Sequence, residues 1–335
     1  MQRSGIPLAV ALLALAAWGT PDGSARAETV VKFGSFIPPQ SVVIRVGAKP
    51  WIEAVEAETA GRVKFQQFLG GGLSRAPDKQ YELMVNGVQD STVVLPSYTQ
   101  ALFPDFSLLG LPYVFDSAEQ SSVATWRMVA SGLLTGLDKV QIVSAWTNSN
   151  SVVNLNRKIT SPDQLKGLKI RVAGPEESDV VKSIGATPVG MSIGQVAESL
   201  NRGVIDGALA GWSALSTFKI TPLIKTHYEE PYGVRTFFLG MRKPAFESLS
   251  AADRAIVMKH GGEVMARRIG VATDRDDDAL KEKVKENILK PSAAERPARA
   301  ALFKKFHDDW IESQKDGRRK YETLMKILAD LRAGI

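Results

Sequence analysis

Short runs of β-branched and aromatic residues alternate with stretches of helical periodicity along most of this chain, starting at Glu28. The first run, Thr29 to Ser35, ends before a loop at Pro38-Pro39, and Val46 to Thr59 carries apolar residues at helical spacing. Such alternation is typical of an α/β fold in which helices cover a mostly parallel sheet. Further strands are expected at residues 63–68, 91–95, 168–173 and 204–209, and further helices at residues 79–85 and 192–200.

The pattern starts again after Asn150, and 335 residues are enough for two separate cores. In this second half Ser161 and Ser192 are each followed three residues later by a glutamine, which is the capping-box signal that opens a helix. After Pro244 the sequence is almost wholly helical. We therefore predict two lobes, with residues 28–148 and 237–276 in lobe I, and residues 149–236 and 277–335 in lobe II with C-terminal helices.

Residues 1–27 have the three parts of a secretory signal peptide. Arg3 gives a positive start, Ile6 to Trp18 is apolar, and Ala25-Arg26-Ala27 supplies small residues at the cleavage site. The apolar part is shorter than the ~20 residues that span a bilayer, and no later stretch is long enough either. We expect a mature chain that starts at Glu28 and is free in the periplasm.

The residues that usually carry catalysis or bind metals are scarce in this chain. The absence of cysteine excludes disulfides, thiolate metal sites, iron–sulfur clusters and a cysteine nucleophile. The histidines, His227, His260 and His307, form no metal motif, and no G-x-S-x-G elbow accompanies them. We expect His260 and His307 to face solvent, whereas His227 is left open between a structural and a pocket-lining role. No catalytic residue, cofactor or metal site is expected.

The formal net charge of +6 does not indicate a nucleic-acid partner, because lysine and arginine are interleaved with aspartate and glutamate. It is compatible with an anionic ligand. The glycines at positions 70–72 lack the Gly-Lys-Ser/Thr that follows in a phosphate-binding loop, so they predict a plain turn. A secreted, two-lobed α/β chain with no visible catalytic group is most simply a binding protein.

Two segments of the second half are more specific: residues 166–172 (KGLKIRV) and residues 203–208 (GVIDGA). They resemble hallmark segments of the substrate-binding proteins of TRAP transporters (tripartite ATP-independent periplasmic transporters, DctP-like). The resemblance implies a two-lobe periplasmic binding protein fold with crossing hinge strands and a small-molecule carboxylate ligand closed between the lobes. It also implies small and large TRAP membrane subunits as partners. Supporting matches occur in order at residues 31–34 (VKFG), 86–90 (NGVQD), 103–104 (FP) and 111–113 (LPY).

Arg171 lies where the resemblance places an arginine that binds the ligand carboxylate. An arginine at a strand end facing a dry cleft offers two parallel N–H groups that match the two oxygens of a carboxylate. The alternative is a salt bridge within the lobe. Asp206 is expected to hold backbone amides at a turn, and Gly207 to permit that turn.

The chain departs from relatives that bind sugar acids at three positions. Gly211-Trp212 replaces a Glu-Asn-Pro stretch, Ser151 stands where they carry a second arginine, and Phe36 replaces a polar residue. These departures predict a flat apolar slot instead of a sugar-acid site. We expect its walls to be Phe36, Trp212, Tyr98 and Trp146, with Asn150 and Ser151 as orienting polar groups.

The sequence therefore predicts a periplasmic solute-binding protein that captures a monocarboxylate with an aromatic or otherwise apolar body for a TRAP-type transporter. Three alternatives stay open. They are an ABC-type binding protein, a periplasmic enzyme acting on carboxylic acids, and a sensor-input protein that passes the same ligand to a receptor.

Overall fold

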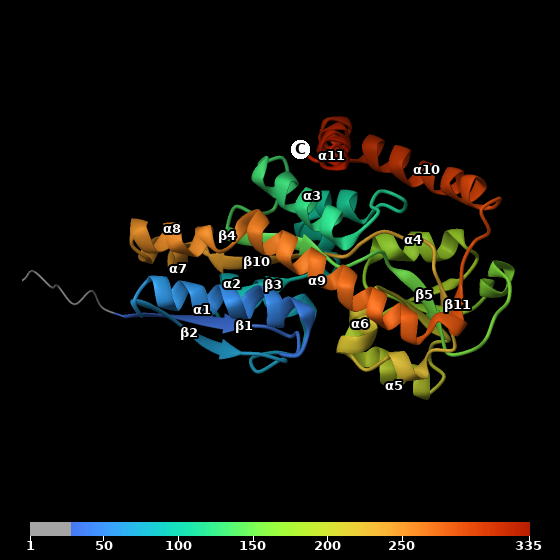
Figure 1. Cartoon of the computed structure of the whole chain (residues 1–335), viewed down its shortest axis with the longest axis horizontal. Coiled ribbons are helices and arrows are strands. Elements are labelled where there is room, and N and C mark those ends of the chain that lie inside the picture. The colour runs from blue at the N-terminus through green and yellow to red at the C-terminus, as the bar shows by residue number, and fades with distance from the viewer. Residues whose placement is uncertain (1–27) are drawn as a thin grey trace, which may run out of the picture.

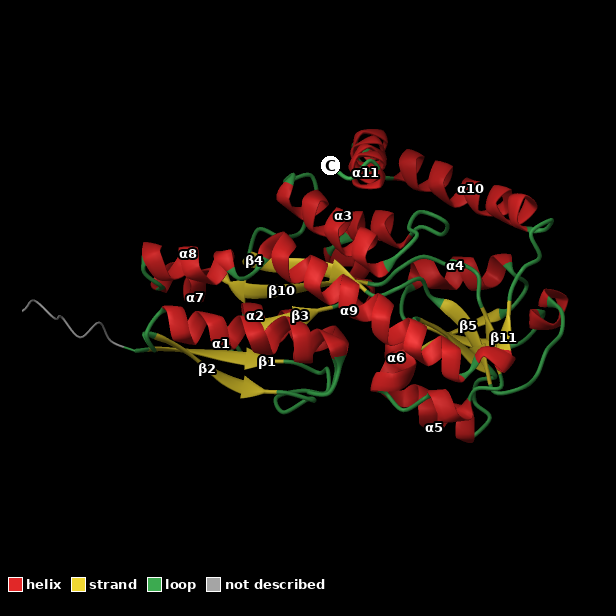
Figure 2. Ribbon diagram, viewed as in Figure 1, coloured by secondary structure: helices red, strands yellow, loops and turns green. Residues whose placement is uncertain are grey.

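The computed structural model describes residues 28–335, so the predicted signal peptide lies outside the described residues. The chain forms two lobes, each built on one sheet with helices against it (Figure 1; Figure 2). The first sheet has the strand order β2-β1-β3-β10-β4, and the second has the order β11-β9-β5-β8-β6-β7. The prediction of an α/β fold with two lobes is confirmed. Within the described residues, no helix is both long and apolar enough to cross a membrane.

Lobe I contains the strands that the N-terminal alternation predicted. Strand β1 pairs in parallel with β2 and β3, and β10 runs antiparallel between β3 and β4. The helix expected at 46–59 is regular only from Lys49 and is preceded by a π-helical turn at Val43–Ala48. The elements are β1 (Thr29–Gly34), α1 (Lys49–Glu58), β2 (Val63–Phe68), α2 (Gln80–Val85), β3 (Ser91–Val94), α3 (Ala118–Ala130), β4 (Val140–Thr147), β10 (Thr236–Arg242), α7 (Lys243–Ser248) and α8 (Ala251–Lys259).

Lobe II repeats the alternation, with β6 parallel to both β7 and β8. Both predicted capping boxes are present, at Ser161 and Ser192, although each opens a short 3-10 turn. The elements are β5 (Val152–Leu155), β6 (Lys169–Val172), α4 (Pro175–Ser183), β7 (Thr187–Gly190), α5 (Val196–Asn201), β8 (Gly207–Ala210), α6 (Trp212–Thr217), β9 (Thr226–Tyr228) and β11 (Ile288–Leu289).

The turn before β8 is held as predicted by Asp206 and requires Gly207 for a different reason. The Asp206 carboxylate accepts the Lys169 backbone N–H at 2.9 Å and pairs with Arg157. Gly207 does not have a positive φ. A Cβ at this position would lie 2.4 Å from the Asn154 carbonyl oxygen. Glycine is therefore required here because β5 and β8 approach closely, and not because of the turn.

Four segments connect the lobes: residues 148–151 between β4 and β5, residues 229–235 between β9 and β10, and the helices α9 (Gly262–Lys283) and α10 (Arg296–Ser313). Figure 1 shows α9 running from the sheet of lobe I toward α6 of lobe II. On this helix Asp274 accepts the backbone N–H groups of Ala118 and Glu119, at 2.8 and 2.9 Å, and so caps α3. The two short connections are those expected of crossing hinge strands, and the two helices reinforce them.

Of the two C-terminal helices, α10 (Arg296–Ser313) packs on both lobes and α11 (Gly317–Arg332) packs on lobe I (Figure 1). Phe303 of α10 is buried in the core of lobe II, whereas Trp310 of α10 and Leu324 of α11 are buried in the core of lobe I. His307, expected to face solvent, is half-buried instead. Its Nε2 lies 2.8 Å from the Pro112 carbonyl oxygen, because α10 lies over that loop. His260 is partly exposed and pairs with Glu58 at 2.6 Å.

Candidate ligand-binding site

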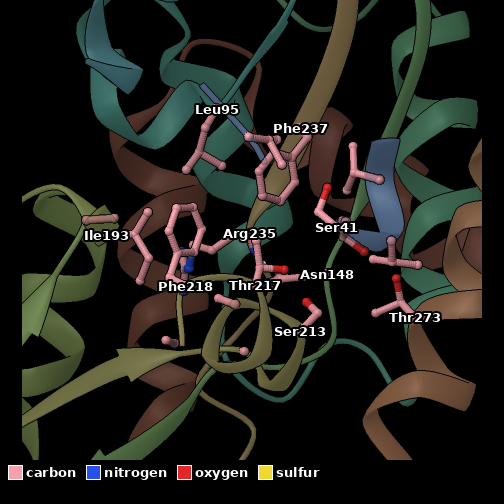
Figure 3. A pocket seen from close by; sticks show the side chains of 18 of the residues that line it. Ser41, Leu95, Asn148, Ile193, Ser213, Thr217, Phe218, Arg235, Phe237 and Thr273 are labelled. Carbon is pink, nitrogen blue, oxygen red and sulfur yellow. The ribbon is translucent and has the colours of Figure 1, made fainter. Parts of the chain in front are cut away.

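A cavity lies between the two lobes and contains about 730 Å³ of empty space, its open mouth included. Figure 3 shows Leu95 and Phe237 entering from one side and Ser213, Thr217 and Phe218 from the other. Apolar side chains make up more than half of the lining residues, and its charged side chains are Arg171, Glu177 and Arg235.

Arg171 is the charged side chain that the sequence analysis placed in this site, and it lines the cavity from β6. The residue is 3% exposed, and all its partners are neutral. Guanidinium has five N–H donors, of which the protein uses three, so one donor stays free on each terminal nitrogen. Two free donors are the number that a carboxylate takes up in a bidentate pair. The partners are the Met191 carbonyl oxygen (2.9 Å from Nε), the Tyr98 hydroxyl (2.7 Å from Nη2) and the Leu209 carbonyl oxygen (3.5 Å from Nη1).

Tyr98 links the lobes across the cavity. It lies in a 3-10 segment of lobe I, Pro96–Leu102, yet its hydroxyl oxygen accepts from Arg171 and from the Ile193 backbone N–H at 3.1 Å, both in lobe II. Burial raises the pKa of the Tyr98 hydroxyl, so it keeps its proton at neutral pH. The sequence analysis expected Tyr98 to be an aromatic wall of the cavity. Its hydroxyl also belongs to the group of polar atoms around the Arg171 guanidinium, which we call the Arg171 corner.

Aromatic rings make up much of the remaining wall. Phe36 and Trp146 line the cavity, where the sequence analysis placed them. Trp146 stacks on Phe237, with ring centroids 6.2 Å apart and planes 7° from parallel. Phe237 and Phe218 also line the cavity and were not identified from the sequence. The available signal for Phe237 was the period-two alternation of β10, since its neighbour Phe238 is fully buried in the core of lobe I.

Trp212, predicted as a wall of the slot, is not among the residues that line the cavity. It is the first residue of α6 and is 1% exposed. Its ring packs 4.6 Å from the ring of His227 inside lobe II. The cavity is instead lined by Ser213, Ala214 and Thr217, which follow it on the helix. The placement of Trp212 was wrong because side chains one position apart on a helix point about 100° apart.

Asn150 and Ser151, predicted as orienting groups, do not line the cavity either. The Asn150 amide donates to the Phe115 carbonyl oxygen at 2.9 Å, which ties the crossing segment to lobe I. The Ser151 hydroxyl oxygen accepts weakly from Arg235 Nε, at 3.4 Å. Both side chains are used to fix the hinge.

His227, left open by the sequence, is fully buried and does not line the cavity. Its Nδ1 lies 2.7 Å from the Asn154 side-chain oxygen on the neighbouring strand. Burial lowers the pKa of this imidazole to about 4, so the ring is neutral at neutral pH and has a structural role. Among residues 28–335, no three histidine, aspartate or glutamate side chains are grouped in a way that could hold a metal ion.

Arg235 is one of two charged residues of the cavity, the other being Glu177, that the sequence analysis missed. It lies at the end of the crossing segment that enters β10 and lines the cavity beside Phe237 (Figure 3). Its Nε is 2.6 Å from the buried carboxylate of Glu177. The cavity therefore has two arginines, and only one of them has a carboxylate partner.

Two lobes joined by crossing segments, with a buried cationic and aromatic cavity between them, are the features of a ligand-capturing binding protein. The family model "Bacterial extracellular solute-binding protein, family 7" (DctP) matches residues 33–316. The chain belongs to this family, which confirms the resemblance to TRAP substrate-binding proteins. The family consists of periplasmic proteins that serve transporters and are not enzymes, and its partners are a small ligand and the TRAP membrane subunits.

Several relatives match over most of their length. The C4-dicarboxylate-binding periplasmic protein DctP of Rhodobacter capsulatus is 25% identical over 289 residues, 84% of this chain and 86% of that protein. A TRAP solute-binding protein from Rhodoferax ferrireducens, solved with copurified benzoate, has a TM-score of 0.82 and 26% identity, covering 90% of this chain and 98% of that one. A marine metagenome TRAP protein specific for aromatic acid ligands, solved with 3-hydroxybenzoate, has a TM-score of 0.83 and 26% identity, covering 91% and 99%.

Proposed function

We propose that this chain captures a monocarboxylate with an aromatic ring and delivers it to the membrane subunits of a TRAP transporter. The observation that carries the proposal is Arg171, which is buried in an aromatic-lined cavity with only neutral partners and two free N–H donors. Charge-assisted hydrogen bonds contribute about 1.5–3 kcal/mol each, so the ligand carboxylate belongs at this corner. The benzoate and 3-hydroxybenzoate bound to the two TRAP relatives support the same class of ligand.

The rest of the cavity suits the body of such a ligand. Phe36, Trp146, Phe218 and Phe237 offer flat apolar faces, on which an aromatic ring buries its area and stacks. The Tyr98 hydroxyl, protonated at neutral pH, has its own hydrogen to donate to a carboxylate oxygen bound at Arg171. The Trp146 indole N–H is buried without a hydrogen-bond partner, so an oxygen substituent on the ring would satisfy it.

Closure of the lobes follows from where these groups lie. Phe36, Tyr98 and Trp146 belong to lobe I, while Arg171 and Phe218 belong to lobe II. A ligand that touches both sets binds the closed arrangement more tightly than the open one and shifts the population toward it. In this proposal closed protein is the form that the membrane subunits receive.

A dicarboxylate is the second candidate, because Arg235 supplies another cation in the same cavity and the Rhodobacter relative binds C4-dicarboxylates. We favour the monocarboxylate because Arg235 is paired with Glu177, whereas Arg171 has no carboxylate partner. Binding without turnover separates either candidate from a periplasmic enzyme, since a binding protein returns its ligand unchanged.

The experiment is a thermal-shift screen of the chain from Glu28, followed by calorimetry. Benzoate and 3-hydroxybenzoate are compared with succinate, a sugar acid and the neutral ligands benzamide and methyl benzoate. Ligand at 100 times its Kd stabilises the folded chain by about 2.7 kcal/mol, so the screen ranks affinities directly. We expect the largest shifts with the aromatic anions. Equal shifts with methyl benzoate would contradict the assignment of Arg171.

The signal peptide is tested separately. We propose cleavage after Ala27, which follows the small-x-small pattern. Intact mass measurement of the protein from the periplasmic fraction is expected to give a chain that starts at Glu28. A mass that retains residues 1–27 would overturn the cleavage site.

A further inference from the structure

Arg235 is a second buried arginine in the cavity, and its backbone is fixed at the hinge. Its backbone N–H donates to the Asn148 side-chain oxygen at 2.7 Å, and its carbonyl oxygen accepts the Asn148 N–H at 3.1 Å. Its side chain is 8% exposed. The guanidinium is therefore held in the cavity wall at the point where the crossing segment enters lobe I (Figure 3).

The charge of Arg235 is matched by carboxylates from the first turn of α4. Glu177 is 1% exposed, and its Oε1 lies 2.6 Å from Arg235 Nε. Its other oxygen accepts the Ala173 backbone N–H, which orients the carboxylate at the positive end of the helix. Glu176 lies further away, at 3.5 Å from Arg235 Nη1. Nothing comparable faces Arg171, whose partners are two carbonyl oxygens and a hydroxyl.

We propose that Glu177 determines the charge of the ligand: it neutralises Arg235, so the cavity has one unmatched positive charge and selects monocarboxylates over dicarboxylates. This inference rests on the proposed function and names the residue responsible for its preference. A second ligand carboxylate near Arg235 would meet Glu177, a buried like charge that cannot move into solvent. Placing an unfavourable charge against the wrong ligand is a general way to obtain specificity.

A purely structural role for the pair gives a different expectation. If Glu177 only fastened α4 to the hinge, its neutralisation would lower stability and weaken all ligands alike. A specificity role changes the ratio of affinities for dianions and monoanions. The ratio is therefore the measurement that separates the two roles.

The test is Glu177→Gln, which keeps the size of the side chain and an oxygen for the Ala173 N–H but removes the charge. Calorimetry compares benzoate with succinate, phthalate, isophthalate and terephthalate, so that several spacings between carboxylates are sampled. We expect the dianion-to-benzoate affinity ratio to rise at least about tenfold for one or more of these spacings. Asp179→Asn is the matched control, since this residue lies on the same helix with its side chain 64% exposed, and it should leave the ratio unchanged.

A second variant guards against a failure of Glu177→Gln to fold. Arg235→Gln leaves Glu177 as an unpaired negative charge in the wall, and we expect it to weaken benzoate at least about tenfold. The double variant Glu177→Gln, Arg235→Gln removes both charges and should regain most of that loss. An unchanged dianion-to-benzoate affinity ratio in Glu177→Gln, or no recovery of benzoate binding in the double variant, overturns the inference. In that case benzoate binding by the wild type still upholds the proposed function. A wild type that binds none of these acids overturns both.

Discussion

Arg171 and Arg235 line one cavity and are similarly buried, at 3% and 7% exposed, yet the chain surrounds them differently. Arg171 is held by neutral oxygens, whereas Arg235 lies against Glu177 and near Glu176. A buried charge without a counter-charge is costly, and the binding of an anion removes that cost. Arg171 is thus available to pair with the carboxylate of a ligand, whereas Arg235 is already neutralised by Glu177.

The largest expected effect is at Arg171. Arg171→Ala removes both free donors and should weaken benzoate at least about 100-fold, because two charge-assisted hydrogen bonds of ~1.5–3 kcal/mol are lost. Arg171→Lys keeps the charge without the fork and should also weaken binding severely. Calorimetry measures both affinities.

The control for Arg171 is Arg202→Ala, at an exposed arginine paired with Glu198 on α5, which should bind benzoate as the wild type does. Circular dichroism and the melting temperature establish that each variant is folded. If Arg171→Ala binds within about threefold of the wild type, the two corners are not distinguished in the way we argue.

The next effect concerns the aromatic side chains that line the cavity. Phe237→Ala removes the ring stacked on Trp146, so benzoate should bind about tenfold more weakly while propionate changes little. Trp212→Phe is the matched variant outside the cavity, and it should lower the melting temperature without changing the benzoate-to-propionate ratio. Equal losses for both acids in Phe237→Ala would rule out a ring-binding slot.

A smaller effect is expected at Tyr98, which belongs to the Arg171 corner although it comes from the other lobe. Tyr98→Phe removes the acceptor shared by Arg171 and the Ile193 N–H and leaves that buried N–H unpaired. We expect about fivefold weaker binding of every carboxylate, aromatic or not, since the loss concerns charge and closure. A loss confined to aromatic acids, measured by the same titrations, would instead assign Tyr98 to the ring slot.

The Arg171 corner could be predicted from the sequence because Arg171 is identified by the residues next to it in the chain. Arg171 lies in a strand segment with a recognisable order of residues, and the strand–helix alternation on either side gave the α/β fold. Phe36, Tyr98 and Trp146 were placed in the cavity correctly, while their contact with a ligand stays a prediction. Trp212 shows the limit of such reasoning, because the start of α6 decides which of two neighbouring residues faces inward.

The Arg235 corner could not be predicted because the residues that form it are far apart in the sequence. Arg235 enters the sheet of lobe I only after the chain has passed through lobe II, and its partner Glu177 comes from α4. Neither residue belongs to a motif, and a lone arginine before a strand is usually solvated. Tertiary structure alone brings Arg235, Glu177 and Phe237 to one cavity.

The smallest expected effect is the pH dependence of the Arg235 corner. Burial raises the pKa of Glu176 to about 7; Arg235 opposes the shift and Glu177 adds to it. Its ordinary value is 4.5, so between pH 4.5 and 7 the folded chain keeps a proton that the unfolded chain has released. The free energy of unfolding contributed by this group is therefore greatest at low pH and falls as the pH rises through that window.

Glu176→Gln cannot ionise and should remove this fall. The variant is expected to melt roughly 2–4 °C above the wild type at pH 8, about what 1 kcal/mol gives, and close to it at pH 5. Glu198→Gln, an exposed carboxylate in an i,i+4 pair with Arg202, should match the wild type at both pH values. Melting curves from pH 5 to pH 8 provide the measurement. If Glu176→Gln shows the wild-type slope, Glu176 is already ionised at pH 5 and Arg235 then has two resident carboxylates, which makes the contrast with Arg171 sharper still.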